Sequence, residues 1–248
     1  MTTRADIRRW VRPLLATDRD LVLLGRELFL TPVHHLLRGL LIDRTRSASW
    51  STVHYAIIPL FDCPATEKSF AWSGTLQLGE NTGYSFPADF RRESDQALTD
   101  LRCVDSISDF FGQVERNDLV VPRLFGVHRL STYYRDHGVA LAALGRLNEA
   151  SLVLQKLTAD WAEYQDVLGQ AEALLAKRGN NVVARFKHDR AMAELQNIEH
   201  LLALRKLIEA RDRPGIGRLL RNWERHNARL WGVEQLWEPT PFPVEKVS

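Results

Sequence analysis

Residues 70–78 read FAWSGTLQL, and this stretch decides the fold class of the first half of the chain. Successive side chains of an extended strand point to opposite faces, so every second residue shares a face. One face carries Phe70, Trp72, Gly74, Leu76 and Leu78. The other face carries Ser69, Ala71, Ser73, Thr75 and Gln77. The pattern predicts a half-buried strand with one face in water.

Two further extended stretches precede it, at residues 36–44 and 50–61. The second places Val53, Tyr55, Ile57 and Phe61 on one side and mixes polar positions into the other. The connecting segments read RTRSAS and DCPATEKS, which are short and rich in turn residues. Parallel strands need crossovers of about a dozen residues or more. The sequence therefore predicts an antiparallel meander.

Helical periodicity precedes these strands. Apolar residues at three- and four-residue steps predict a helix over residues 6–15. Thr17 or Asp18 is a candidate cap for a second helix that runs to Phe29 and stops before Pro32.

Helical periodicity returns after the strands. Residues 87–116 read as one long amphipathic helix that covers the sheet, and residues 119–125 read as an edge strand or linker broken by Pro122. The apolar stripe of the long helix is Ala97, Leu98, Leu101, Val104, Ile107, Phe111 and Val114. The order of elements predicts an α+β domain over residues 1–126.

After Gly126 the composition shifts toward Leu, Ala, Arg, Glu and Gln, and strand-like alternation does not return. We therefore predict an all-α domain over residues 127–237, followed by a proline-rich tail over residues 238–248. The predicted fold class of the whole chain is α+β, with an N-terminal antiparallel sheet and covering helices followed by helical hairpins.

Residues 132–161 read TYYRDHGVALAALGRLNEASLVLQKLTADW. Their aromatic, small and turn positions are Tyr134, Gly138, Leu141, Gly145, Ala150 and Leu154. With these offsets the stretch resembles a tetratricopeptide helical hairpin. In physical terms, Gly138 and Ala150 let two antiparallel helices approach closely, and Gly145 ends the first helix.

Turn-type glycines recur at Gly179 and Gly215, with spacings of 34 and 36 residues that are close to the tetratricopeptide period. The stretch departs from the pattern at His137, Leu157 and Ala162. Residues 148–177 and 182–211 can each also form one long helix. Three stacked hairpins and an antiparallel bundle of long helices are both open.

A second resemblance concerns the first half of the chain. LLRGLLIDRT (36–45) followed by STVHYAIIPLF (51–61) is similar in general pattern to small uncharacterised bacterial domains found around toxin and immunity genes. This likeness carries over no site residues.

Composition excludes several classes of protein. A chain of 248 residues with 45% hydrophobic and 26% charged residues forms a real core, which excludes a disordered or collagen-like chain. Cys63 and Cys103 have neither a disulfide framework nor zinc spacing and are expected to be reduced. Neither a signal peptide nor a membrane span is expected. Arginine outnumbers lysine 27 to 6. We expect a bacterial cytoplasmic protein.

Motifs of common chemistries are missing from the sequence. It contains no GxxxxGK[ST], GxSxG, HExxH or EF-hand loop, so we assign no catalytic residue, cofactor or metal. The remaining combinations are weak, and each is better explained by a surface, loop or structural role. They are the set His34, His35 and His54, the thiol of Cys63, the helix-face pair Asp105 and Asp109, and the group His188, Glu199 and His200.

Charge is segregated along the chain. Residues 177–229 carry a net charge of +7, against −5 for the rest and +2 overall. At about 100° per residue, one arc of the last long helix carries four arginines, opposite a tryptophan-rich seam. The candidate partner-binding residues are these four together with two aromatic residues: Arg218, Arg221, Arg225, Arg229, Tyr133 and Trp237.

Three hypotheses about function follow. The leading one is a non-catalytic protein-interaction module, such as an adaptor, an immunity-type inhibitor or a subunit of a larger assembly, which binds a protein partner through its helical half. The alternative is nucleic-acid binding through the basic C-terminal helices. The second alternative is an enzyme with an unrecognised site.

Overall fold

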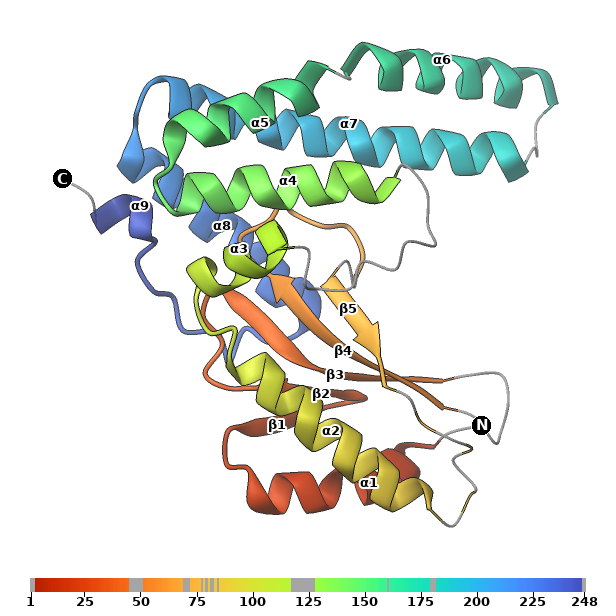
Figure 1. The fold of residues 1–248 in the computed structure, drawn as a ribbon. Coiled ribbons are helices and arrows are strands. Elements are labelled where there is room, and N and C mark those ends of the chain that lie inside the picture. The colour runs from red at the N-terminus through yellow and green to blue at the C-terminus, as the bar shows by residue number, and fades with distance from the viewer. Residues whose placement is uncertain are drawn as a thin grey trace. The chain divides into compact units, whose positions relative to one another are not determined.

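The computed structural model describes residues 3–44, 51–68, 72–76, 78, 80, 83, 85–116, 128–159, 161–178 and 182–246. The predicted α+β fold class is confirmed, because an antiparallel sheet in the N-terminal half is followed mostly by helices (Figure 1). The chain forms two compact units. Unit 1 contains Met1–Phe61, Ala65–Phe125 and Arg225–Thr240, and unit 2 contains Asp62–Pro64, Gly126–Glu224 and Pro241–Ser248. The domain boundaries at residues 126 and 237 stay a prediction.

The sheet of unit 1 is a five-stranded antiparallel meander in the order β1-β2-β3-β4-β5, as the short connections predict. Its strands are β1 (Leu21–Leu24), β2 (Glu27–Leu30), β3 (Leu36–Arg44), β4 (Ser51–Pro59) and β5 (Trp72–Thr75). In β5, Trp72 is buried, whereas Thr75 is exposed. Of the predicted strand over residues 70–78, residues 70, 71 and 77 lie outside the described residues.

The predicted second helix, from Thr17 or Asp18 to Phe29, is wrong: this segment forms the β1–β2 hairpin. The run Leu21–Leu24 is apolar throughout, and periodicity does not distinguish a short buried strand from a buried helical segment. Gly25 has a φ of 67°, which lets the chain reverse in a tight turn. Strand β2 also pairs with β3. This pairing joins residues that are distant in the sequence, so local sequence patterns do not predict it.

Helix α1 (Arg4–Thr17) confirms the helix predicted over residues 6–15. Its start is a capping box, in which the Thr3 hydroxyl accepts a hydrogen bond from the Asp6 backbone amide at 3.1 Å and the Asp6 carboxylate accepts one from the Thr3 amide at 3.0 Å. Trp10 lies on the buried face, with its ring centroid 4.8 Å from that of Phe86. Phe86 is the first residue of the next helix along the chain, Phe86–Arg102, so α1 packs against that helix.

The long helix predicted over residues 87–116 is two helices, α2 (Phe86–Arg102) and α3 (Ile107–Arg116). Ser106 starts the second one, because its hydroxyl accepts a hydrogen bond from the Asp109 amide at 3.1 Å and Asp109 accepts one from the Ser106 amide at 3.0 Å. The predicted apolar stripe is buried, with Val104 between the two helices and the other members on α2 or α3. Helix α2 lies across β3 and β4 (Figure 1).

The opposite face of the sheet is covered by the C-terminal part of unit 1. Side chains of β3 and β4 form one buried cluster with Ala228, Trp231 and Val233. The segment after them is held by a backbone pair, in which Val33 donates to the Leu236 carbonyl at 3.2 Å and Glu238 donates to the Val33 carbonyl at 2.8 Å. The central strands are therefore buried on both faces, which explains why β4 is less strictly alternating than β5.

Gly39 in β3 is a position where only glycine fits. An added Cβ would lie 2.3 Å from the Leu28 carbonyl oxygen and 2.9 Å from Cδ1 of Phe29. Because a backbone oxygen cannot rotate away, we expect Gly39→Ala to lower the free energy of unfolding by about 2 kcal/mol. Urea unfolding followed by circular dichroism measures the change. Gly169→Ala is the control, because an added Cβ there meets nothing within 4 Å in a helix, where alanine is favoured. Equal stability of both variants would contradict this packing.

Unit 2 is helical. It begins with α4 (His128–Ala143) and α5 (Leu147–Ala159), which form an antiparallel hairpin. Gly138 lies against Leu154, with 2.7 Å between an added Cβ and Cδ2 of Leu154, and Gly145 has a φ of 80°. Gly138 therefore allows the close approach of the two helices, and Gly145 adopts the positive φ that ends the first helix, as predicted. The assignment to the tetratricopeptide class stays a prediction.

The rest of unit 2 departs from an even repeat. Residues 148–177 contain most of α5 and most of α6 (Trp161–Arg178), whereas α7 (Val182–Glu209) is one long helix. Helix α6 packs along one half of α7 and α5 packs along the other (Figure 1). The chain then forms α8 (Arg213–Trp231), which ends in unit 1, and the short α9 (Pro243–Lys246).

The two further turn glycines have different outcomes. Gly215 does not lie in the connection between two helices. It lies in the first helical turn of α8, where its amide donates to the Asp212 carboxylate at 2.9 Å. The chain reverses before it, at Arg211, which has a φ of 53°. Gly179 lies outside the described residues.

Candidate functional site

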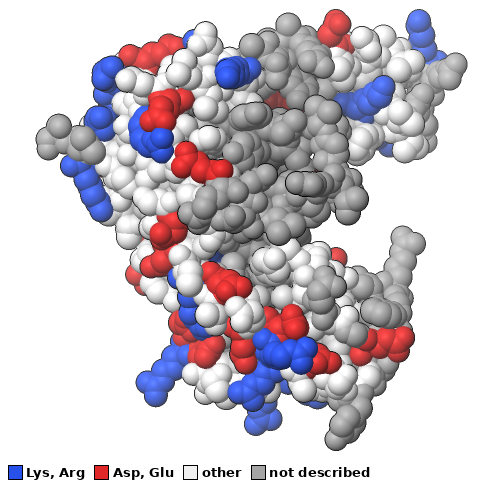
Figure 2. All heavy atoms as spheres, viewed as in Figure 1, with Lys and Arg blue, Asp and Glu red and all other residues white. Residues whose placement is uncertain are grey.

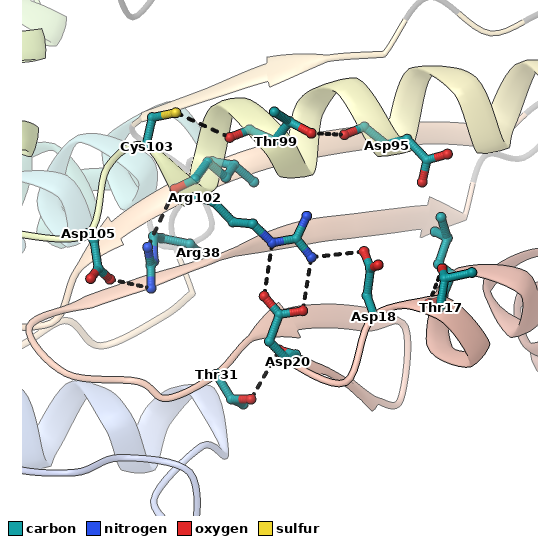
Figure 3. Close-up of polar contacts among 12 residues, drawn as sticks. Thr17, Asp18, Asp20, Thr31, Arg38, Asp95, Thr99, Arg102, Cys103 and Asp105 are labelled. Carbon is teal, nitrogen blue, oxygen red and sulfur yellow. Dashed lines mark hydrogen bonds and ion pairs between the residues drawn. The ribbon is translucent and has the colours of Figure 1, made fainter.

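A partly exposed polar network in unit 1 joins the start of the sheet to the end of α2 (Figure 3). Arg102 donates from Nε to Asp20 at 2.9 Å and from Nη2 to Asp18 at 2.8 Å. Arg38 of β3 is 6% exposed, pairs with Asp105 at 2.8 Å and donates to the Val104 carbonyl at 3.2 Å. The backbone carbonyl groups just after α2 have no helical hydrogen-bond partner. Arg38 supplies a donor to one of them, the carbonyl of Val104. The arrangement is structural, and Asp105 belongs to it.

The Arg102 contacts make stability depend on pH. The hydrogen bond from Arg102 lowers the pKa of Asp20 below its usual range. A carboxylate with a lowered folded-state pKa contributes stability above its unfolded pKa of about 3.9, and this stability is lost as pH falls through the folded value. We expect Arg102→Met to cost about 1 kcal/mol or less at neutral pH, since both groups are partly exposed.

The measurement is urea unfolding of wild type and Arg102→Met at about pH 7 and about pH 3. The difference in the free energy of unfolding between wild type and Arg102→Met should be smaller at the lower pH. Arg91→Met is a matched control on the same helix, because Arg91 pairs with Asp95 at 3.7 Å on the surface. A difference that stays constant down to about pH 3 would argue against a role of the ionised Asp20.

The structure separates the histidines that the sequence singles out. The His34 ring lies 3.1 Å from the Glu238 carbonyl, and the His35 ring lies 3.0 Å from the Thr240 hydroxyl. His54 instead contacts Thr75 at 3.2 Å. His54 pairs with Leu41 within the β3–β4 ladder, whereas His35 precedes the first pair of that ladder. At about 3.3 Å per residue they lie roughly 20 Å apart along the strand, so they form no common site.

Cys63 belongs to a buried ionic cluster of unit 2. Arg135 of α4 donates to Asp62 at 2.7 Å and to Asp136 at 3.2 Å, and the Asp136 side chain is 1% exposed. Burial opposes the charge of Arg135, but Asp62 and Asp136 outweigh it and raise the pKa of Arg135. Burial, with the charge of Asp62, raises the pKa of the Cys63 thiol well above its usual range. Such a thiol is a poor nucleophile.

The predicted arginine stripe is matched by nearby acidic or aromatic groups. Within unit 2, Arg218 lies 3.9 Å from Asp212, and Arg221 pairs with Glu245 of α9 at 2.6 Å. Sequence periodicity could not reveal the second pair, because Glu245 is 24 residues away. These contacts reduce the positive potential that the sequence alone suggests.

The other two arginines of the stripe belong to unit 1. Arg229 pairs with Glu234 at 3.0 Å, and the Arg225 guanidinium lies 6.0 Å from the centre of the Trp237 ring. Trp237 itself is half-buried and packs against the cluster around Trp231. Tyr133 lies in α4, and its side chain is outside the described residues. Partner binding through these residues stays a prediction.

The remaining titratable candidates are dispersed. His188 contacts its neighbour Asp189 at 3.1 Å, and the His200 ring lies 5.8 Å from the Trp223 ring. Asp109 caps α3. Across the described ranges, no three His, Cys, Asp or Glu side chains lie together in a way that could hold a metal ion. None of the described helices is long and apolar enough to cross a membrane.

An exposed apolar surface lies at one end of the α6–α7 hairpin. We call it the hairpin tip and define it by the exposed side chains nearest the connection between the two helices. It consists of Leu174 on α6 and Val182, Val183 and Phe186 on α7, which are 40%, 77%, 65% and 66% exposed. Single exposed apolar residues are ordinary on soluble proteins, whereas a group of them is a candidate binding surface.

Helix α7 carries apolar residues on two opposite sides, and the hairpin tip includes those on one of them. At about 100° per residue, the residues that pack α7 into unit 2 fall within an arc of roughly 60°. They are Ala184, Ala191, Leu195 and Ile198, all buried. Val182, Val183 and Phe186 fall on the other side of the helix within an arc of roughly 100°. An interpretation of residues 182–211 as helix alone missed this second apolar side, although its spacing is present in the sequence.

Basic side chains outnumber acidic ones around the hairpin tip, and the exposed carboxylates of Glu172 and Asp189 lie at the two ends of the basic segment. Residues 173–188 contain four basic residues, Lys177, Arg178, Arg185 and Lys187, and no acidic one. The side chains of Lys177, Arg185 and Lys187 are exposed. The hairpin tip therefore combines apolar contact area with positive charge.

Comparison of the chain with protein-family models, with curated protein sequences and with solved structures gives no significant match to any of them.

Proposed function

We propose that this protein is a non-catalytic protein-interaction module that binds an acidic segment of a partner protein through the hairpin tip. The observation that supports this most is the exposure of Phe186, at 66%, beside Val182 and Val183 on a helix whose opposite side is already packed. Apolar groups that are exposed in the unbound protein gain about 25 cal/mol per Å² when a partner covers them. The partner segment therefore carries apolar side chains.

The positive charge of the same surface favours a partner segment of negative charge. Lys177, Arg185 and Lys187 lie near the apolar side chains in the sequence, and these exposed basic residues outnumber the exposed carboxylates of Glu172 and Asp189 at the ends of the segment. Electrostatic complementarity speeds encounter and excludes partners of the same sign. An acidic, amphipathic helix or strand satisfies both the apolar and the charged part of the surface.

Nucleic-acid binding, the alternative function, has less support. A phosphate-binding surface needs arginines and lysines available to phosphates, and affinity follows the number of such contacts. Three of the four stripe arginines instead lie within 4.0 Å of a carboxylate, at Asp212, Glu245 and Glu234. An exposed apolar group such as Phe186 adds area for a protein segment but no phosphate contact.

Binding of a defined probe tests the proposal. The probe is a labelled amphipathic peptide of glutamate and leucine, and its affinity is measured by fluorescence anisotropy against three other ligands. These are a lysine–leucine peptide of the same pattern, a single-stranded RNA oligonucleotide and vesicles that contain anionic lipid. We expect the acidic peptide to bind with a dissociation constant on the order of 10 μM and the basic peptide not to bind. Preference for RNA or vesicles, or equal binding of both peptides, would overturn the proposal.

A further inference from the structure

A cavity of about 270 Å³ lies within unit 1, between α2, strand β4 and the edge strand β5. Its wall toward the core is apolar and aromatic, with Ile57, Trp72, Ala97 and Leu101. All four are buried, and Trp72 is held in place by Phe110 of α3, with 5.6 Å between the ring centres. Most of the described lining residues therefore come from the sheet and two helices.

The lining also includes the apolar Leu76 and Val104 and a set of polar and acidic side chains. Glu93, Gln96 and Asp100 come from α2, Gln113 comes from α3, and Tyr55 comes from β4. Among the described residues that line the cavity, two are carboxylates and none is lysine or arginine. Figure 2 shows red acidic side chains gathered over the region of α2, with blue basic ones among them.

Two features leave the polar groups available to a ligand. Glu93 pairs with Arg92 at 3.2 Å, but the Arg92 side chain is 68% exposed and does not line the cavity. Within the described part of the chain, the Asp100 carboxylate accepts a hydrogen bond from Gln96 at 3.0 Å. An ionised carboxylate has about four acceptor positions, so both groups can accept further donors from a ligand.

Gly74 of β5 fixes the position of Tyr55. An added Cβ at Gly74 would lie 2.1 Å from the Tyr55 hydroxyl oxygen, so the ring of Tyr55 crosses β5 where no side chain stands. This glycine pairs with Tyr55 in the β4–β5 ladder. The cavity thus gains an aromatic side chain beside the Trp72 ring, and aromatic faces attract cations.

We propose that this cavity binds a small organic cation, namely a primary amine or guanidinium compound with an apolar part. Glu93 and Asp100 accept its N–H groups, and its apolar part lies between Ile57, Trp72 and Leu101. The cavity lies below the usual range of about 300–1,000 Å³ for drug-sized ligands, so the ligand is of metabolite size. The proposal does not depend on partner binding at the hairpin tip.

Three phenyl compounds that differ only in the polar end provide the test. Phenethylamine, 2-phenylethanol and phenylacetate are titrated into the full-length protein, and binding is followed by amide chemical shifts of α2 and β5. We expect phenethylamine to bind with a dissociation constant on the order of 1 mM, as suits so few atoms. The alcohol should bind about tenfold more weakly, and phenylacetate should not bind. Equal binding of amine and alcohol, or no binding of the amine, would overturn the proposal.

Substitutions locate the effect. The double variant Glu93→Gln with Asp100→Asn should weaken phenethylamine binding about tenfold, because it removes both charges and keeps the shape. Asp95→Asn is the matched control, since Asp95 is an acidic residue of the same helix that does not line the cavity. Unchanged affinity in the double variant, or equal loss in Asp95→Asn, would show that the amine binds elsewhere. Thermal unfolding of each variant confirms that it is folded.

Discussion

Arg135→Met should lower the free energy of unfolding by about 3–5 kcal/mol, the largest stability effect that we expect. The substitution keeps much of the apolar volume but leaves Asp62 and Asp136 without the cation between them. Asp136 has a side chain that is 1% exposed, and Asp62 has one that is 14% exposed. Removing one partner of a buried ionic cluster costs far more than the cluster as a whole contributes, because the remaining charges stay desolvated.

Urea unfolding followed by circular dichroism measures this effect, with the slope m compared between variants. Arg205→Met is the matched control, because Arg205 pairs with Glu209 at 2.7 Å on the surface of α7 and such pairs contribute about 0.3–0.5 kcal/mol. The triple variant Arg135→Met, Asp62→Asn and Asp136→Asn should recover part of the loss. A loss below about 1 kcal/mol in Arg135→Met would contradict the buried cluster.

Phe186→Glu should weaken binding of the acidic amphipathic peptide about 100-fold. The substitution removes the aromatic anchor of the hairpin tip and adds a charge of the same sign as the partner. Because Phe186 is 66% exposed, stability should change by no more than about 0.5 kcal/mol. Fluorescence anisotropy gives the affinity, and thermal unfolding confirms that the fold is unchanged.

Two further variants separate the hairpin tip from exposed apolar surface in general. Leu152→Glu replaces a leucine of α5 that is 64% exposed and lies away from the tip, so affinity should be unchanged. Lys187→Glu reverses a charge beside Phe186 and should weaken binding more at low salt than at high salt. Equal effects of Phe186→Glu and Leu152→Glu would show that no specific surface is involved.

Much of the fold follows from local signals in the sequence. The turn-rich connections on either side of residues 50–61 predict the antiparallel meander, and the stripe from Ala97 to Val114 predicts the face that is buried. The glycines at 138 and 145 predict the α4–α5 hairpin, because one position needs a close helix approach and the other a positive φ. These signals succeed because each lies within a few residues of the structure that it determines.

The signals fail where partners are distant in sequence. Residues 21–30 are apolar enough for a helix or a strand, and pairing with β3 decides between them. Asp62 lies 73 residues from Arg135, and Glu245 lies 24 residues from Arg221, so the ionic contacts of both arginines were missed. A solvated arginine stripe and a paired one have the same periodicity. Only the packed structure distinguishes them.

The hairpin tip was missed for a different reason. Its residues are at helical spacing, as are those of the buried side of α7, and exposure cannot be read from spacing when a helix is apolar on both sides. The absence of acidic residues over positions 173–188 was visible in the sequence, within a net charge of +7 assigned to a longer segment. Combining the two signals would have placed the candidate site on α7 rather than on α8.

Site-specific cross-linking in cells shows whether the hairpin tip binds an acidic protein segment. A photoreactive phenylalanine analogue replaces Phe186 in cells that express the protein, and the attached peptide is sequenced by mass spectrometry. The same substitution at Leu152, which is 64% exposed, is the control. We predict that position 186 captures a protein segment rich in Asp and Glu with apolar residues among them, and that position 152 does not. A nucleic-acid or lipid adduct, a basic segment, the same product from both positions, or no adduct at position 186 would contradict the account.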